Sequence, residues 1–437
     1  MNFNEVFLER MKEILGDEFD GFVESLNNSI QKSIYVNENK IAIEDFKKIV
    51  DFSIEQIPYE KAGFYVDGEK KGRHSLHHAG AFYMQEPSAM FTVNSVKFNG
   101  DEIVLDMCSA PGGKSIQIAN RIPNGALVSN EIVKSRSEIL YSNIERMGLK
   151  NVIITNETPE KLGEVYGNTF DVVLVDAPCS GEGMFRRGED VIKEWYPEIN
   201  VMCASRQLEI LNHADKTLKQ NGILVYSTCT YSLLENEGVV KEFLKSHNYE
   251  LVSIDCDLPR GIEMQEAVRL YPHKVKGEGQ FVAVLRKLEE NTNSCSTGVK
   301  LSNSKFTMDF CETHLNFDAD TLKQVVEYNN YSYYTPKKEL VKKRVNYVSI
   351  GVKLGKVEKN RFEPHHNIFS AFGDNFKLKL LLDFQDEKVK KYLRGETFDV
   401  DLSDGYGAVL VNGCALGGFK ISHGKLKNRY PKGLRNF

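Results

Sequence analysis

Two cysteines lie directly after apolar segments of the chain, in surroundings that suit nucleophilic chemistry. Cys229 follows the apolar run Ile223–Tyr226, and Cys179 follows a similar run that ends at Asp176. Such runs between turn residues predict buried β-strands, and in open α/β sheets ligands bind beyond the carboxyl ends of the strands. Because a cysteine thiolate is a strong nucleophile, two thiols at such an edge indicate a site for covalent chemistry.

The segment between residues 103 and 285 contains the elements that would position these cysteines. Apolar runs alternate there with helical patterns, which predicts an α/β domain with a doubly wound parallel sheet. The predicted strands and helices are Ile103–Leu105, Lys114–Arg121, Ala126–Val128, Lys134–Met147, Val152–Ile154, Val172–Val175, Val201–Thr217 and Ile223–Tyr226. Two more strands, Tyr249–Ile254 and Phe281–Leu285, are expected to close the sheet, the last of them antiparallel. We also expect Ser232 and Glu235 to begin a helix as a capping box.

A glycine-rich turn follows the first predicted strand and leads into the first helix of this segment. It consists of Cys108, Ser109, Ala110, Pro111, Gly112, Gly113 and Lys114. Small residues at such a turn let the backbone approach a ligand closely. The turn is not a phosphate-binding P-loop, because Cys108 stands where that motif needs a glycine, and it does not fit the dinucleotide motif G-x-G-x-x-G.

The ends of the next three predicted strands carry polar residues that suit a nucleoside. Glu131 ends the second strand, where a carboxylate can accept hydrogen bonds from ribose hydroxyl groups. Asn156, Glu157 and Thr158 end the third strand, beside the expected position of an adenine, and Asp176 ends the fourth. Because S-adenosylmethionine has no pyrophosphate that a P-loop would bind, the series indicates S-adenosylmethionine as the cofactor.

The composition is that of a soluble globular protein. Of its 437 residues, 41% are hydrophobic and 27% are charged. No apolar run reaches the roughly 18 residues of a membrane-spanning helix, and the N-terminus lacks the apolar segment of a signal peptide. We therefore expect a monomeric cytoplasmic protein that does not bind a membrane. None of the eight cysteines forms a C-x-x-C pair, so neither a metal site nor a disulfide framework is expected.

Charge is distributed unevenly along the chain. Residues 300–437 contain 24 Lys and Arg against 16 Asp and Glu, whereas the whole chain has a net charge of −5. A basic C-terminal part on an acidic chain suggests a polyanionic partner. An uneven but solvated surface is the alternative explanation.

Four sequence motifs resemble those of the Nop/Sun family of RNA cytosine-5 methyltransferases, and in particular its bacterial small-subunit ribosomal RNA methyltransferases of the F type. They are DMCSAPGGKS, VSNEIVKSR, VDAPCSGEGMFRR and YSTCTYSLLENE, and the segments QEPSAM and YPKGLRN add to the likeness. The resemblance covers nearly the whole chain. It implies a Rossmann-like, S-adenosylmethionine-dependent enzyme that methylates RNA, with 16S ribosomal RNA or the small ribosomal subunit as the partner. Thr158 departs from the family pattern, since an acid is expected there near the adenine.

Cytosine-5 methylation needs a thiol that adds to carbon 6 and an acid that protonates N3 of the base. Asp176 is placed to be that acid, and Lys114 could orient Asp176 or contact the cytosine carbonyl. The spacing of the cysteines alone does not decide which of them attacks. DNA cytosine-5 methyltransferases use the cysteine of a Pro-Cys pair, which would be Cys179 here. The family resemblance implies Cys229 instead, with Cys179 assisting release of the product.

Basic side chains near the predicted site and in the C-terminal part are candidates for RNA contacts. They are Arg186, Arg187, Lys425, Lys427, Arg429, Lys432 and Arg435. Three other functions stay open at this point. The first is a tRNA cytosine-5 methyltransferase, the second is a DNA cytosine-5 methyltransferase that attacks with Cys179, and the third is an inactive RNA-binding assembly factor.

The patterns divide the chain into four predicted parts. Residues 1–60 form an N-terminal α/β module, and residues 61–290 form the methyltransferase domain. Residues 291–366 contain a polar linker and an intermediate module rich in basic and aromatic residues. Residues 367–437 form a β-rich module that resembles a PUA-like RNA-binding domain.

Overall fold

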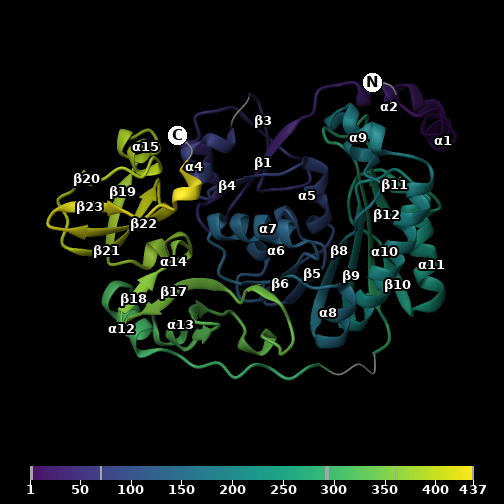
Figure 1. Ribbon diagram of the computed structural model, residues 1–437. Coiled ribbons are helices and arrows are strands. Elements are labelled where there is room, and N and C mark those ends of the chain that lie inside the picture. Colours follow the sequence, from purple (N-terminus) through teal and green to yellow (C-terminus); the bar gives the residue numbers. More distant parts are fainter. Residues whose placement is uncertain (1–2, 69–70, 291–294, 360, 436–437) are drawn as a thin grey trace.

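The computed structural model describes residues 3–68, 71–290, 295–359 and 361–435. A large mixed sheet occupies the centre and right of Figure 1, a small N-terminal sheet lies above it, and the C-terminal strands lie on the left. Within the described ranges, no helix is both long and apolar enough to cross a membrane.

The central sheet contains ten strands in the order β11-β12-β13-β9-β8-β5-β6-β7-β16, with β10 paired to β13. Five neighbouring strands are parallel, namely β5 (Ile103–Asp106), β6 (Ala126–Asn130), β7 (Val152–Thr155), β8 (Phe170–Asp176) and β9 (Leu218–Thr228). β10 (Tyr249–Val252) and β13 (Gln280–Lys287) are both antiparallel to their neighbours. The predicted parallel sheet with an antiparallel last strand is therefore confirmed.

Helices cover both faces of the central sheet. Val104 is buried in one core cluster together with Leu140 of α7, whereas the next residue, Leu105, is buried in another with Leu162 of α8 and Leu211 of α10. This alternation arises because successive side chains of a strand point to opposite faces. The helices are α6 (Gly113–Arg121), α7 (Lys134–Met147), α8 (Pro159–Val165), α9 (Glu189–Glu194), α10 (Glu198–Thr217) and α11 (Val239–Ser246). With both faces covered, the carboxyl edge is where a ligand can bind.

The sheet also contains strands that the apolar pattern does not predict. β12 (Met264–Leu270) pairs antiparallel with β13, and the short β11 (Arg260–Gly261) pairs with β12. At the other edge, β16 (Tyr347–Ser349) comes from the intermediate module and pairs with β7. Strands of two or three residues are too short to give a periodic signal in the sequence. The intermediate module therefore completes the sheet of the methyltransferase domain.

The predicted capping box after Cys229 is wrong. The backbone N–H of Ser232 donates to the Thr230 hydroxyl at 3.2 Å, and the carboxylate of Glu235 bonds to other residues. Residues Leu234–Gly238 form a π-helical turn, η4, before α11 begins at Val239. The tertiary partners of Glu235 outcompete the local cap, because a buried carboxylate needs several donors and the chain brings them from other elements.

The N-terminal module contains an antiparallel sheet in the order β2-β3-β1-β4. Its elements are α1 (Glu5–Leu15), α2 (Phe19–Leu26), β1 (Lys32–Val36), α3 (Ile43–Ile49), β2 (Ile54–Gln56), β3 (Gly63–Val66), α4 (Ser75–His78), β4 (Phe82–Met84) and α5 (Pro87–Asn94). A boundary at residue 60 would separate β2 from β3 within one sheet. We therefore propose that this module extends through β4.

The C-terminal half contains two further sheets, in the orders β14-β15-β17-β18 and β19-β21-β22-β23-β20. The intermediate module comprises α12 (Lys305–His314), α13 (Ala319–Lys323), β14 (Val325–Tyr328), β15 (Tyr331–Tyr334), β17 (Val352–Glu358) and β18 (Arg361–Pro364). The last module comprises α14 (His366–Phe372), β19 (Leu378–Leu382), α15 (Glu387–Leu393), β20 (Phe398–Asp399), β21 (Gly405–Val411), β22 (Cys414–Ser422) and β23 (Lys425–Asn428). The β-rich character predicted for the C-terminal module is confirmed.

Candidate active site

The two cysteines lie side by side at the carboxyl edge of the central sheet. β8 and β9 are parallel neighbours in which Asp176 pairs with Ser227, and each strand is followed within a few residues by its cysteine. The sulfur atoms of Cys179 and Cys229 are 3.3 Å apart. The hydrogen bond to Cys229, together with burial, raises the pKa of Cys179 well above its ordinary value. Cys179 is therefore a neutral thiol at neutral pH and can donate its proton toward the Cys229 sulfur.

Asp176 is held by donors from three different elements. Lys114 Nζ of α6 lies 2.7 Å from Oδ2, Ser227 Oγ of β9 donates to Oδ1 at 2.7 Å, and Gln280 Nε2 of β13 donates to Oδ1 at 3.2 Å. Burial lowers the pKa of Lys114, but the negative charge of Asp176 outweighs burial and the net direction is upward. The side chains thus form a fixed ion pair beside the two thiols.

Ser227 and Gln280 are site residues that the sequence reasoning missed. Ser227 lies inside the motif YSTCT and could have been found once β8 and β9 were aligned, because it is the pairing partner of Asp176. Gln280 comes from an antiparallel strand far along the chain, and no local pattern singles it out.

The glycine-rich turn lies between β5 and α6, as its sequence indicates. Two side chains of α7 hold its backbone: Arg136 donates to the Ala110 carbonyl at 2.8 Å, and Asn143 donates to the Pro111 carbonyl at 2.9 Å. Within the turn, the Ser109 hydroxyl donates to a β5 carbonyl at 2.8 Å. Hydrogen bonds from α7 and to β5 therefore fix the backbone of the turn.

Glu131 directly follows β6, next to the glycine-rich turn. Its side chain is 3% exposed, accepts a hydrogen bond from the Val133 backbone at 2.9 Å, and lies 3.4 Å from Arg136. Arg136 thereby contacts both the turn and Glu131. The carboxylate is oriented by these two contacts at the sheet edge.

The three residues after β7 are tied to the intermediate module and to α8. The backbone N–H of Asn156 donates to the Asn346 carbonyl at 2.9 Å, and the Glu157 carboxylate accepts from the Asn346 N–H at 2.8 Å. The Thr158 hydroxyl accepts from the Lys161 N–H at 3.2 Å and caps α8. Thr158, the departure from the family pattern, thus has a helix-capping role.

Comparison with known proteins now defines the family. Residues 93–286 match the family model of 16S rRNA methyltransferase RsmB/F, residues 3–87 match the N-terminal domain of 16S rRNA methyltransferase RsmF, and residues 379–436 match the methyltransferase RsmF PUA domain. The ribosomal RNA small subunit methyltransferase F of Vibrio vulnificus is 31% identical, over 98% of this chain and 97% of that protein. The chain belongs to the ribosomal RNA small subunit methyltransferase F family.

A second relative has the same name, and two solved structures share the fold of the catalytic part. The methyltransferase F of Erwinia tasmaniensis is 29% identical, over 99% of this chain and 96% of that protein. A crystal structure of a methyltransferase homologue from Pyrococcus horikoshii is 30% identical, with a TM-score of 0.58 over 66% of this chain and 96% of that one. The fold of NSun6 from Pyrococcus horikoshii is also similar, at 24% identity and a TM-score of 0.59 over 66% of this chain and 99% of that one.

Membership of the methyltransferase F family makes S-adenosylmethionine the cofactor of this protein. The glycine-rich turn at the carboxyl edge has a backbone conformation that depends on glycine. Gly112 has a φ of +113°, and an added Cβ would lie 3.0 Å from Leu140, so the position requires glycine. Cys108 at the start of the turn is half-buried, and burial raises the pKa of its thiol, so it lines the turn as a neutral group.

Asp106 at the end of β5 gives the methyltransferase a pH-dependent stability that can be measured. Its Oδ2 accepts from Ser115 at 2.6 Å, but its buried Oδ1 has no hydrogen-bond partner among the residues that the structure describes. Burial raises the pKa of Asp106 to about 7. The folded protein thus binds a proton that the unfolded chain releases near pH 4, and the free energy of unfolding should fall between pH 4 and 7 by up to about 1.4 kcal/mol per pH unit.

Urea unfolding of the wild-type protein and of Asp106→Asn, without cofactor, isolates this contribution. The difference in unfolding free energy between the two proteins should change in favour of Asp106→Asn as the pH rises from 4 to 7, and then level off. A difference that is the same at every pH would contradict the assignment.

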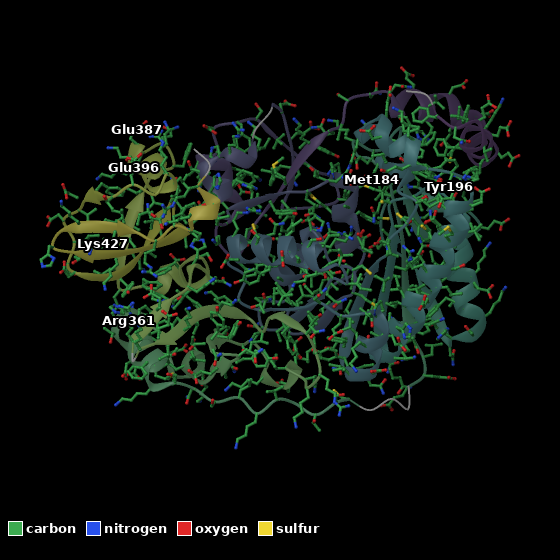
Figure 2. The ribbon with its side chains drawn as sticks, in the orientation of Figure 1. Met184, Tyr196, Arg361, Glu387, Glu396 and Lys427 are labelled. Carbon is green, nitrogen blue, oxygen red and sulfur yellow. The ribbon has the colours of Figure 1, made fainter. Side chains whose placement is uncertain are left out.

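The residues predicted to bind RNA fall into two groups in this methyltransferase. Four arginines make intramolecular contacts: Arg186 donates to the carbonyls of Gly277 and Ser29, Arg187 to Glu278, Arg429 to Glu363 and Arg435 to the Tyr430 carbonyl. Lys425, Lys427 and Lys432 are exposed, and no ion pair involves them in the described part of the chain. In Figure 2, Lys427 lies in the C-terminal module, on the opposite side of the molecule from Met184, which belongs to the segment after Cys179. Because the three lysines are exposed and form no ion pairs there, they are the better candidates for phosphate contacts.

Proposed function

We propose that this protein transfers a methyl group to carbon 5 of cytosine in RNA, with 16S ribosomal RNA as its substrate. The observation that carries the proposal is the pair of sulfur atoms 3.3 Å apart beside the Lys114–Asp176 ion pair. This reaction needs a nucleophile, an acid for the base and a group that assists release, and these side chains supply all three. The names of the relatives, which specify small-subunit ribosomal RNA, support the substrate.

In the first step of the proposed mechanism, Cys229 attacks the base. The Cys229 thiol gives its proton to the Asp176 carboxylate, and the sulfur adds to carbon 6 of the cytosine. The displaced electron pair moves to N3, which takes that proton from Asp176. Carbon 5 then has enamine character and is nucleophilic. The cofactor, when bound, supplies an electrophilic methyl group for this carbon. Lys114 keeps Asp176 oriented toward the base through the 2.7 Å contact.

The second step needs loss of the carbon-5 proton and cleavage of the Cys229–carbon 6 bond. Water takes the carbon-5 proton, and the electron pair of the carbon-5–hydrogen bond restores the ring double bond as the Cys229 sulfur leaves. N3 returns its proton to Asp176. Cys179 lies 3.3 Å from that sulfur and donates a hydrogen bond to the leaving thiolate. The family resemblance assigns attack to Cys229 and release to Cys179, and the direction of the pKa shift of Cys179 agrees with a thiol that donates a hydrogen bond.

The cofactor is proposed to lie against the glycine-rich turn, with Glu131 accepting hydrogen bonds from its ribose. Glu131→Gln should weaken S-adenosylmethionine binding by roughly 1–3 kcal/mol, because a buried charged acceptor for two hydroxyl groups is lost. Isothermal titration calorimetry on the folded variant measures the effect. As a control, Glu138→Gln changes an exposed carboxylate on α7. Equal affinities of the wild-type protein and Glu131→Gln would exclude Glu131 from the cofactor site.

The RNA is proposed to reach from the active site to the C-terminal module. Replacement of Lys425, Lys427 and Lys432 together by glutamine should weaken RNA binding and reduce the slope of log Kd against log salt by about 2 to 3, since each phosphate contact releases about one counterion. Binding at several salt concentrations is the measurement. Point substitutions are preferable to removal of the module, because β22 bonds to the N-terminal module: Lys40 donates to the Ala415 carbonyl at 2.9 Å. An unchanged slope would show that these lysines do not contact phosphates.

Bisulfite sequencing of RNA from a strain that lacks this protein tests the function as a whole. We expect the loss of 5-methylcytosine from at least one position of 16S ribosomal RNA, and its return when the wild-type gene is supplied. Loss from tRNA instead would support a tRNA methyltransferase. An unchanged 5-methylcytosine pattern in both RNAs would leave the inactive assembly factor as the better description.

A further inference from the structure

The loops that carry the two cysteines are joined behind the site by buried hydroxyl groups. Ser180 directly follows Cys179, and Thr230 directly follows Cys229. Their hydroxyl oxygens are 2.8 Å apart, and both side chains are buried. The separation of the two sulfur atoms therefore depends on how this pair of hydroxyl groups is held.

Glu235 of the π-helical turn η4 fixes the position of this pair through hydrogen bonds to Ser180. Its carboxylate is fully buried and accepts four hydrogen bonds. One oxygen accepts from the Ser180 hydroxyl at 2.5 Å and from Asn200 at 2.6 Å, and the other accepts from the Ser180 backbone N–H and from Gln207, both at 2.9 Å. All four partners are donors, so this environment is built for a carboxylate with two accepting oxygens.

Two further contacts fix the turn that carries Glu235. Tyr226 of β9 donates its hydroxyl to the Glu235 backbone carbonyl and is itself bonded to Gln207 at 3.0 Å. Asn200 bonds to the Ser180 hydroxyl at 3.0 Å as well as to Glu235. π-Helical turns are rare in proteins, and many of those that occur lie at functional sites, where they reorient one side chain. Here the reoriented side chain points to the residue that follows Cys179.

We propose that Glu235 is a positioning residue that sets the place of Cys179 relative to Cys229, and thereby controls release of the methylated base. The proposal rests on the proposed function, since it assumes a covalent bond between Cys229 and the base. Glu235 touches neither cysteine side chain. It acts through the backbone and the hydroxyl group of Ser180.

Glu235→Gln is the sharpest substitution, because it keeps the shape and exchanges one accepting oxygen for an NH₂ group. In either orientation of the amide, its NH₂ group faces a donor that cannot become an acceptor, either the Asn200 amide or the Ser180 backbone N–H, so the contacts that hold the Cys179 loop are weakened. A displacement of about 1 Å at a reacting group can cost about a hundredfold in rate. We therefore expect release of the product to slow by about tenfold to a hundredfold, while cofactor affinity stays within about twofold of wild type. A covalent protein–RNA species should then accumulate in the presence of S-adenosylmethionine.

Two companion variants separate positioning from general destabilisation. Ser180→Ala removes the hydroxyl contacts to Thr230, Glu235 and Asn200 but keeps the backbone hydrogen bond to Glu235, and it should give a smaller accumulation of the same covalent species. Glu237→Gln is the control for stability, because Glu237 is a buried carboxylate of the same turn that bonds to Arg269 and to Ile262. It should lower thermal stability without accumulation of the covalent species.

The experiment follows one turnover on an RNA substrate, with the methyl label and the covalent species on denaturing gels quantified together. If Glu235 acts through Cys179, the release rate of Glu235→Gln with Cys179→Ala should equal that of Cys179→Ala alone. Additive losses in the double variant, or slower methyl transfer with no accumulation of the covalent species, would overturn the proposal. If the wild-type protein itself forms neither 5-methylcytosine nor a covalent species, the proposed function fails, which is a different result.

Discussion

Replacement of Cys229 by alanine is expected to abolish both methylation and the covalent protein–RNA species, whereas replacement of Cys179 by alanine should leave the covalent species trapped. Removal of a covalent nucleophile lowers turnover by on the order of 10⁴-fold or more. The sulfur atoms lie 3.3 Å apart, so both thiols reach the same base, but only one of them can be bonded to carbon 6. Without the thiol of Cys179, the Cys229 sulfur has no donor as it leaves.

Denaturing electrophoresis of each variant with RNA and S-adenosylmethionine is the measurement. Cys179→Ser provides a matched control, since its hydroxyl group keeps a donor of similar size and should restore part of the release. If Cys229→Ala traps RNA while Cys179→Ala does not, the roles of the two cysteines are reversed. The protein would then follow the mechanism of the DNA enzymes.

Replacement of Asp176 by asparagine should have the second largest effect. Asparagine keeps the size and can still accept from Ser227, but it cannot protonate N3 of the base and leaves Lys114 without its ion-pair partner. General acid–base catalysis typically contributes about 10²–10⁴-fold, and we expect turnover to fall by about that factor. The covalent species should decrease together with turnover, because attack on carbon 6 itself depends on the acid.

Single-turnover rates with saturating RNA and cofactor test this expectation. Asp171→Asn is a suitable control, since Asp171 lies near the start of β8, away from the site, and pairs with Lys219. A rate for Asp176→Asn within about threefold of wild type would remove Asp176 from the chemistry. Accumulation of the covalent species in this variant would instead place Asp176 in the release step.

The local patterns of the chain were sufficient for the parallel sheet and for the elements that carry the two cysteines. Apolar runs between turn residues mark β5 to β9 because a strand buried on both faces needs consecutive apolar side chains. Short edge strands lack this signal, so β11 and β16 appear only in the folded structure. The capping box at Ser232 failed for the related reason that Glu235 is buried and bonded to residues from other elements.

The sequence by itself determined the family and the cofactor and indicated the residues that we propose for covalent catalysis, because these depend on residue types in short motifs. Only the tertiary structure decided how they combine. It brought Ser227 and Gln280 to Asp176 and joined the two cysteine loops through Ser180 and Thr230. It also placed four predicted RNA-binding arginines in contacts within the protein. These contacts join residues far apart in the chain. They exist because burial obliges each polar group to find a partner, and the fold, rather than the local sequence, determines which partners are in reach.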